Sequence, residues 1–211
     1  MTNMIILTAG EFGFQVGALL AKRQSAVTHE VTAAGVDLES ALSFADFVAV
    51  ALWRPYVRIC EQVDDICQRR GIRWSLTEIV GDKLHCGPLI VPGMSPCYRC
   101  YRKRYLSHHT APDREMTLHG AYERDPRCGV PGHIYPMAVT AAGALSSDLA
   151  AEHSNAGRLR VVELLGGGVL EVTVLGVHGC PVCGAQRDSA VGARYVDRLI
   201  PEIKELLEDV R

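Results

Sequence analysis

The sequence lacks long apolar segments and any strong excess of charge of one sign. No apolar run is long enough to span a bilayer. The apolar stretch within residues 1–17 has no preceding basic region and no small-residue cleavage signature, so we expect no signal peptide. The formal net charge of −2 gives no global electrostatic reason to expect nucleic acid or an anionic membrane as a partner. We therefore expect a cytoplasmic protein that binds neither.

Familiar catalytic motifs are also missing. The eight histidines show neither HExxH nor HxH spacing, which argues against a second, catalytic metal. Ser95, Ser146 and Ser147 lie in no GxSxG context. The chain has 211 residues, of which 48% are hydrophobic and 22% are charged, and these values suit a globular protein with one full hydrophobic core.

The first ninety or so residues alternate short apolar runs with helical patterns. Residues 47–52 are continuously apolar, as expected of a strand buried on both faces. Residues 57–70 have a helical period that ends at Gly71. We expect strands at residues 4–7, 27–34, 47–52, 72–80 and 84–91, and helices at residues 14–23, 37–44 and 57–70. This order predicts an α/β fold with a doubly wound, Rossmann-like, mostly parallel sheet.

The second half of the sequence has a different pattern. Residues 101–131 are rich in Arg and His and poor in aliphatic residues, so we expect a long loop or crossover segment. Residues 135–152 are Ala-rich and helical in pattern. Residues 158–165 and 169–177 predict an antiparallel C-terminal hairpin joined by three glycines. An amphipathic helix is expected at residues 195–210.

These patterns predict one domain over residues 1–211. Its expected parts are a β/α half at 1–96, a cysteine pair with the crossover loop at 97–134, a helix, hairpin and second cysteine pair at 135–190, and a C-terminal helix at 191–211.

Two CxxC pairs are the most specific motif in the chain. Two residues between thiols allow both sulfur atoms to face one ion, and Zn²⁺ prefers four tetrahedral sulfur or nitrogen ligands. A closed four-cysteine shell leaves no position for a substrate, so the spacing predicts a structural zinc site. The alternatives are a thioredoxin-like redox pair, core cysteines that bind no metal, or a mixed ligand set that includes His85 or His178. The predicted ligands are Cys97, Cys100, Cys180 and Cys183, and the other cysteines are Cys60, Cys67, Cys86 and Cys128.

A family resemblance rests on two segments that contain these pairs. Residues 87–100 have the sequence Gly-Pro-Leu-Ile-Val-Pro-Gly-Met-Ser-Pro-Cys-Tyr-Arg-Cys, and residues 180–184 are Cys-Pro-Val-Cys-Gly. Over roughly residues 4–184 the chain resembles the ubiquitin-activating-enzyme-like (ThiF/MoeB) superfamily. The first segment is similar to that of shortened ThiF-like partner proteins from azoline-forming ribosomal peptide clusters. The resemblance implies a homodimer, and a protein that presents a precursor peptide to a YcaO-type cyclodehydratase.

The sequence departs from this family at the nucleotide site. Gly10 and Gly13 match two positions of the glycine-rich turn, but Thr8 stands where the fingerprint has its first glycine. As an alternative, these glycines and Gly17 serve only to bring the helix close to the sheet. The acidic pair and the Asn, Arg, Gln and Lys set of adenylating members are missing after the second strand. Because adenylyl transfer depends on cationic clamps and metal, we expect a degenerate site that does not use ATP.

Cys128 is the only cysteine within residues 101–131. Arg124, Arg127 and His133 flank it in the sequence, and nearby cations lower the pKa of a thiol. One interpretation is a nucleophile for thioester or persulfide chemistry. The other is an incidental cysteine beside a turn.

A basic cluster follows the first cysteine pair and is interleaved with tyrosines. It could form a binding face for an acidic peptide, or it could be solvated or paired with acidic residues of the same segment. Its members are Arg99, Arg102, Lys103 and Arg104.

Taken together, these features favour a non-catalytic ThiF-like scaffold in the biosynthesis of a thiazole- or oxazole-type ribosomal peptide. The first alternative is an ATP-dependent adenylyltransferase that acts on a peptide or carrier-protein C-terminus. The second is a thiol or sulfur-transfer protein that uses Cys128.

Overall fold

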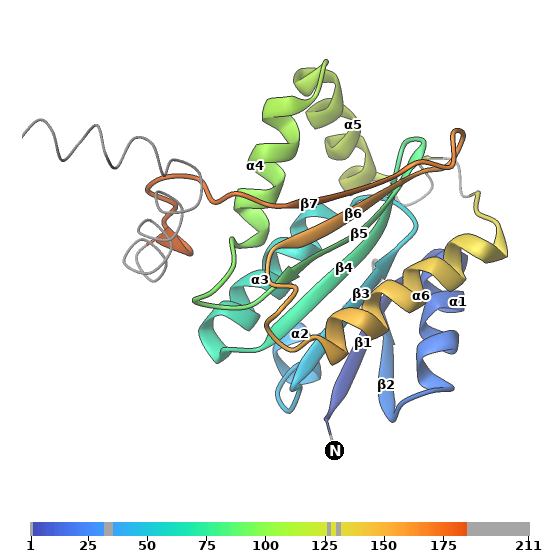
Figure 1. The fold of residues 1–211 in the computed structure, drawn as a ribbon, viewed down its shortest axis with the longest axis vertical. Helices are drawn as coiled ribbons and strands as arrows, with labels where there is room; N and C mark the ends of the chain where they lie inside the picture. Colours follow the sequence, from blue (N-terminus) through green and yellow to red (C-terminus); the bar gives the residue numbers. More distant parts are fainter. Residues whose placement is uncertain (1, 32–35, 126–127, 130–131, 185–211) are drawn as a thin grey trace, which may run out of the picture.

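The computed structural model describes residues 2–31, 36–125, 128–129 and 132–184. A seven-stranded sheet runs through this part of the chain in the order β2-β1-β3-β4-β5-β6-β7 (Figure 1). The strands are β1 (Met4–Ala9), β2 (Ala26–Glu30), β3 (Phe47–Leu52), β4 (Arg73–Val80), β5 (Lys83–Ile90), β6 (Arg158–Glu163) and β7 (Val169–Thr173). The helices are α1 (Gly10–Ala21), α2 (Leu38–Ala41), α3 (Val57–Arg70), α4 (Tyr98–His108), α5 (Pro112–Arg124) and α6 (Tyr135–Ala150).

The first four strands form the parallel half of the sheet. β1 pairs in parallel with β2 on one side and with β3 on the other, so the strand order reverses between β1 and β3. Every residue of β1 and β3 is buried, as the continuous apolar runs predict. Helices α1 and α6 cover one face, and α2, α3 and α4 cover the other (Figure 1). The predicted Rossmann-like α/β class is therefore confirmed.

β5 departs from the predicted parallel arrangement. Only two residues, Gly81 and Asp82, separate β4 from β5, and the two strands pair antiparallel. A parallel crossover needs about a dozen residues, so a connection of this length forces a hairpin. β6 and β7 extend the sheet with two further antiparallel pairs, as the C-terminal hairpin predicts.

The prediction of a long loop at residues 101–131 is wrong for most of that segment. The segment forms α4 and α5, which are joined by a short connection. The buried side chains of α4 are Tyr98, Cys100 and Tyr101, and the one buried side chain of α5 is His119. The buried faces of both helices consist of tyrosine, cysteine and histidine side chains rather than aliphatic ones. A search for aliphatic residues at helical spacing therefore misses both helices.

Other boundaries differ by a few residues. Helix α1 begins at Gly10 rather than at residue 14, and β2 ends at Glu30. The amphipathic helix expected at residues 195–210 lies outside the described residues. In the part that is described, no helix has the length and apolar character needed to cross a bilayer.

Candidate functional site

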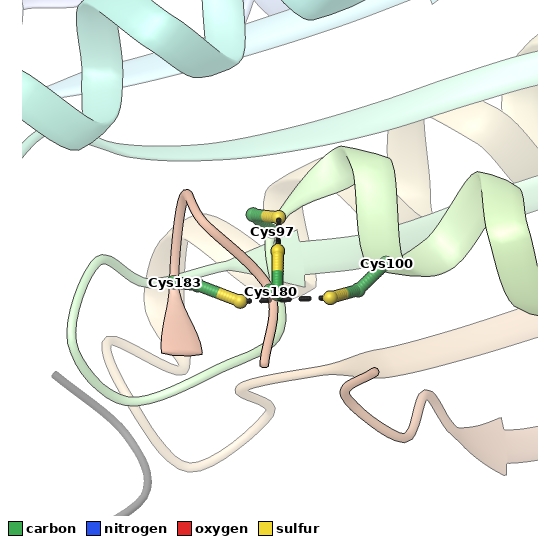
Figure 2. Close-up of side chains that lie close together, drawn as sticks. All are labelled: Cys97, Cys100, Cys180 and Cys183. Atoms are coloured by element: carbon green, nitrogen blue, oxygen red, sulfur yellow. Dashed lines mark hydrogen bonds between the residues drawn. The ribbon is translucent and has the colours of Figure 1, made fainter. Parts of the chain in front are cut away.

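The four predicted metal ligands come together although the partners in each pair, Cys97 with Cys180 and Cys100 with Cys183, are 83 positions apart in the sequence. Figure 2 shows the sulfur atoms converging from the start of α4 and from the segment that follows β7. One sulfur atom from each cysteine lies within 4.8 Å of the other three, and all four side chains are buried. No other group of this kind was found among the described residues, and neither His85 nor His178 belongs to it.

The spacing of the sulfur atoms suits a metal ion and not disulfides. The distance is 3.7 Å from Cys97 Sγ to Cys180 Sγ and 3.5 Å from Cys100 Sγ to Cys183 Sγ. A disulfide needs about 2.05 Å. Four thiolates at about 2.3 Å from a tetrahedral Zn²⁺ would lie about 3.8 Å apart. The chain therefore supplies four buried sulfur ligands that could hold a metal ion, and their donor set fits zinc.

Backbone hydrogen bonds shape the two halves of this cluster. The Cys97 carbonyl accepts from the N–H groups of Cys100 and Tyr101, which winds the first pair into the first turn of α4. The Gly184 N–H donates to the Cys180 carbonyl at 2.8 Å and closes a matching turn. The Val177 N–H points at Cys100 Sγ at 3.3 Å, a donor that stabilises a thiolate.

A buried carboxylate fixes the start of α4. Asp64, in α3, accepts a hydrogen bond from the Tyr98 N–H at 3.1 Å and another from Trp74 Nε1 at 3.3 Å. Burial raises the pKa of Asp64 to about 6. The contact satisfies a helix N–H that has no partner within the helix, directly beside Cys97. Asp64 thus ties the first cysteine pair to the sheet-covering helix α3.

Three of the remaining cysteines belong to the hydrophobic core. Cys60 and Cys67 lie in α3, Cys86 lies in β5, and all three are buried. Burial raises the pKa of the Cys86 thiol to about 12. These thiols are apolar packing groups.

The glycine-bearing turn between β1 and α1 has a packing role. Gly10 begins α1 with φ +67°, and a Cβ atom at this position would overlap Trp53 Cδ1. A Cβ atom on Gly13 would overlap the Ala51 carbonyl oxygen of β3, and one on Gly17 would lie 3.1 Å from Thr8 Cγ2. The glycines therefore bring α1 close to the sheet, which is the packing alternative considered from the sequence.

Trp53 lies where a nucleotide phosphate would approach this turn. It follows β3, at the carboxyl end of the strands and at the point where the strand order reverses, which is the usual ligand position in such sheets. Its ring lies against Gly10 on one side and Gly129 on the other. Its Nε1 donates to the Tyr56 hydroxyl at 3.0 Å, which fixes the ring over the turn.

An open cleft of about 210 Å³ lies beside Trp53. Glu11, in the first turn of α1, accepts from Gln15 Nε2 at 3.3 Å, and Gln15 Oε1 lies 3.0 Å from His133 Nε2. Phe12, Ile79, Gly132 and Tyr135 complete its lining. The cleft therefore presents a carboxylate at a helix N-terminus, where phosphate-binding folds leave free N–H groups.

Cys128 lies close to a buried arginine. Arg54 donates through Nη1 to the Cys128 carbonyl and through Nη2 to the Tyr122 carbonyl at 3.1 Å. Its guanidinium also lies 4.7–4.8 Å from the ring centroids of Trp53, Tyr56 and Tyr122. Arg54 thus joins the end of α5 to the end of β3, and it holds the backbone carbonyl of Cys128. Sequence reasoning did not identify this arginine, because nothing in its flanking residues distinguishes it.

The basic cluster is divided over different sides of α4. Arg99 pairs with Asp65 of α3 through Nη2 at 3.1 Å, and Arg104 donates to the carbonyls of Leu175 and Gly176. Arg102 faces the interior, beside Glu78 and His119, while Lys103 is exposed. Arg99 therefore pairs with a residue of α3, and not with an acidic residue of its own segment, which was the alternative considered from the sequence. Lys103 and Arg104 are the members that face outward.

A buried polar network joins α4 and α5 to the sheet, and sequence reasoning missed it. The Tyr101 hydroxyl lies 2.7 Å from His85 Nδ1 and donates to Glu78 Oε1 at 3.3 Å. Burial raises the pKa of Glu78 to about 7 and lowers that of His85 to about 4. The sequence contained one signal for this network, because Glu78 is a charged residue within a strand whose preceding residues, 74–77, are all buried.

The second part of this network lies on α5. The Tyr105 hydroxyl donates to Glu115 Oε1 at 2.9 Å, and His119 Nε2 lies 3.1 Å from the same oxygen. Burial lowers the pKa of His119 to about 4. The packing of α5 on the molecule therefore depends on polar contacts.

Comparison with known proteins identifies the fold. No protein-family model matches the sequence, and no curated protein does. Among solved structures, the heterocyclase TruD matches with a TM-score of 0.56 at 16% identity, over 87% of this chain and 27% of TruD. A heterocyclase in complex with substrate and cofactor matches with a TM-score of 0.53 at 16% identity, over 86% of this chain and 25% of that one.

Escherichia coli MccB with ATP matches with a TM-score of 0.59 at 18% identity, over 87% of this chain and 66% of MccB. The chain shares the fold of these proteins. It spans about a quarter of the length of the heterocyclases and about two thirds of that of MccB. These neighbours confirm, at the level of fold, the resemblance found in the sequence.

Proposed function

We propose that the chain is a non-catalytic ThiF-like scaffold in the biosynthesis of a thiazole- or oxazole-type ribosomal peptide. It would help to present a precursor peptide to a YcaO-type modifying enzyme. The observation that carries the proposal is the position of Trp53 against Gly10, where phosphates bind in Rossmann-like sheets. The fold neighbours, two heterocyclases and MccB, support a role in peptide natural-product biosynthesis.

The charges around the turn support the same proposal. Glu11 places a carboxylate in the first turn of α1, where it would repel a polyphosphate. Among the described residues, the arginine beside Trp53 is Arg54, which is buried and bonded to backbone carbonyls. Adenylyl transfer needs cationic groups and a metal directed at the phosphates. Among the described residues, neither lysine nor arginine lines the cleft, which suits binding better than this chemistry.

The cysteine cluster would act as a structural zinc site within this scaffold. Cys97, Cys100, Cys180 and Cys183 would occupy all four positions of a tetrahedral ion, which leaves none for catalysis. When bound, zinc would hold the segment after β7 against the start of α4. A homodimer, as implied by the sequence resemblance, also belongs to this proposal.

An adenylyltransferase is the second candidate. The observations that favour it are the fold shared with MccB, which has been solved with ATP, and the cleft of about 210 Å³ beside the glycine-bearing turn. The substrate would be a peptide or carrier-protein C-terminus.

Isothermal titration of the zinc-loaded protein with Mg·ATP separates the two candidates, with Mg·AMP as the control. We expect no detectable ATP binding, because Trp53 covers the turn. Micromolar binding of ATP would overturn the scaffold proposal and favour the adenylyltransferase. A peptide-dependent exchange of pyrophosphate into ATP would do the same.

A further inference from the structure

β7 is an exposed strand at one end of the sheet. All five of its residues are exposed, and no other described strand pairs with its outer edge (Figure 1). Three of its side chains are aliphatic and substantially exposed: Val169 by 67%, Leu170 by 60% and Val172 by 38%. Aliphatic residues on an unpaired edge are unusual in a protein that does not use that edge.

The backbone of β7 offers hydrogen-bonding groups on its outer side. The Val174 N–H donates to the Gly157 carbonyl, and the Glu163 N–H donates to the Gly168 carbonyl. In the register of the hairpin, these bonds imply that the N–H and C=O groups of Leu170 and Val172 in β7 point toward β6. The N–H and C=O groups of Val169, Glu171 and Thr173 therefore point away from the sheet. An extended peptide could bond to all three residues.

β7 has few of the features that usually protect an edge strand, apart from its short length and the charged residue Glu171. It contains no proline and no lysine, and its register with β6 is continuous over five residue pairs. β2, the other edge, has the polar residues Thr28, His29 and Glu30 at its carboxyl end.

The charges beside β7 favour an acidic occupant. Leu170 and Val172 share a face with their cross-strand neighbours Val161 and Leu159, on the side of the sheet that α4 covers. On that side, Arg104 reaches the carbonyls of Leu175 and Gly176, just beyond the end of β7.

One further basic residue of α4, Lys103, is exposed next to Arg104 in the sequence. On the opposite face, the carboxylate of Glu171 is paired with Arg158 at 3.2 Å and with Arg160 at 3.3 Å. On the α4 side, the described charged residues near the end of β7 are therefore basic, while Glu163 places an exposed carboxylate beside the start of the strand.

We propose that β7 binds an acidic peptide segment, which adds to the sheet as an eighth strand. Backbone hydrogen bonds to Val169, Glu171 and Thr173 would supply affinity, and side chains directed toward α4 would select apolar and acidic residues. The inference rests on the proposed role in handling a precursor peptide, and it names the surface involved. Pairing of two β7 strands from two copies is less favourable, because the register that aligns all five residues places Glu171 opposite itself.

The test is fluorescence anisotropy of a labelled peptide of alternating valine and glutamate, titrated with the full chain. The deciding pair of variants is Glu171→Pro and Glu171→Ala. Both lose the ion pairs of the side chain, but only proline removes the outward N–H, and proline is tolerated on an edge strand. Val169→Pro and Val169→Ala form a second pair, in case the first proline variant does not fold. Lys103→Glu tests the charge preference.

We expect Glu171→Pro to bind the peptide about tenfold more weakly than Glu171→Ala, as the loss of a main-chain hydrogen bond predicts. Lys103→Glu should also weaken binding, and a valine–lysine peptide should bind poorly. Equal binding by both members of each pair, or equal affinity for the basic peptide, would overturn the proposal. So would sedimentation that shows self-association abolished only by the proline variants, since a second copy would then occupy the edge. If the peptide does not bind to β7 and the titration also shows no ATP binding, the proposal for β7 fails while the scaffold proposal remains.

Discussion

The indole ring of Trp53 lies against the backbone of Gly10 so closely that no side chain fits at residue 10. Gly10 also has φ +67°, a conformation that L-residues adopt only at a cost. We expect Gly10→Ala to destabilise the protein by about 2 kcal/mol or more, from backbone strain together with displacement of the ring.

Urea unfolding measures this effect, and Gly143→Ala is the matched control. Gly143 lies on the exposed side of α6, and a methyl group at this position would have no neighbour within 4 Å. Alanine there should therefore be neutral or stabilising by up to about 1 kcal/mol. Equal stability of the two variants would show that Trp53 does not rest on the turn.

Loss of the cysteine cluster should release the segment after β7. Cys183→Ser is expected to reduce the bound zinc of the purified protein from about one ion per chain to none, since a hydroxyl is a poor zinc ligand. The unfolding free energy should fall by several kcal/mol, because the ion would close a long loop between the two cysteine pairs.

Metal analysis by mass spectrometry and thermal melting measure these two effects. Cys128→Ser is the control, since Cys128 is not part of the cluster, and it should retain both metal and stability. A Cys183→Ser protein that keeps one zinc ion would show that another ligand completes the site.

Asp64 should position the first cysteine pair through its hydrogen bond to the start of α4. Asp64→Ala leaves the N–H groups of Tyr98 and Trp74 without their acceptor in the core, at a cost of about 1–3 kcal/mol for each. We also expect weaker zinc binding, because the start of α4 loses its anchor. Competition with a chromophoric chelator measures the affinity, and Asp65→Ala, at a half-exposed ion pair with Arg99, should change it little.

The sequence was sufficient to predict the parallel half of the sheet and the four cysteines, because both depend on local signals. Continuous apolar runs identify β1 and β3, and CxxC spacing identifies the four cysteines that come together, without knowledge of the fold. The two-residue connection between Val80 and Lys83 also carried enough information to predict a hairpin, although the alternation of elements favoured a parallel strand.

Other features depend on contacts between distant segments. The role of Trp53 requires β3 and α1 to be adjacent, and the role of Arg54 requires the end of α5 to return to β3. Helices α4 and α5 were not predicted because tyrosine and histidine provide their buried surface. In each case the missing information is tertiary, since no pattern within one element records which polar partners it will meet.

The buried histidine His85 should make stability depend on pH. Its pKa is lowered from 6.5 to about 4, chiefly by burial, so the folded state favours the neutral imidazole. The unfolded chain therefore takes up the proton first as the pH falls. The resulting contribution to stability is fully present above pH 6.5 and is lost as the pH falls from 6.5 to about 4. Glu78, with its pKa raised to about 7, acts in the opposite direction over an overlapping range.

Comparison with His85→Gln isolates the histidine from Glu78 and from proton uptake by the cysteine cluster. Urea unfolding of both proteins between pH 7.5 and 4.5 should show the wild type losing stability relative to the variant as the pH falls. Glutamine keeps a polar group opposite the Tyr101 hydroxyl but does not titrate. A constant difference between the two proteins across this range would mean that His85 keeps an ordinary pKa, and that water reaches the space between α4 and the sheet.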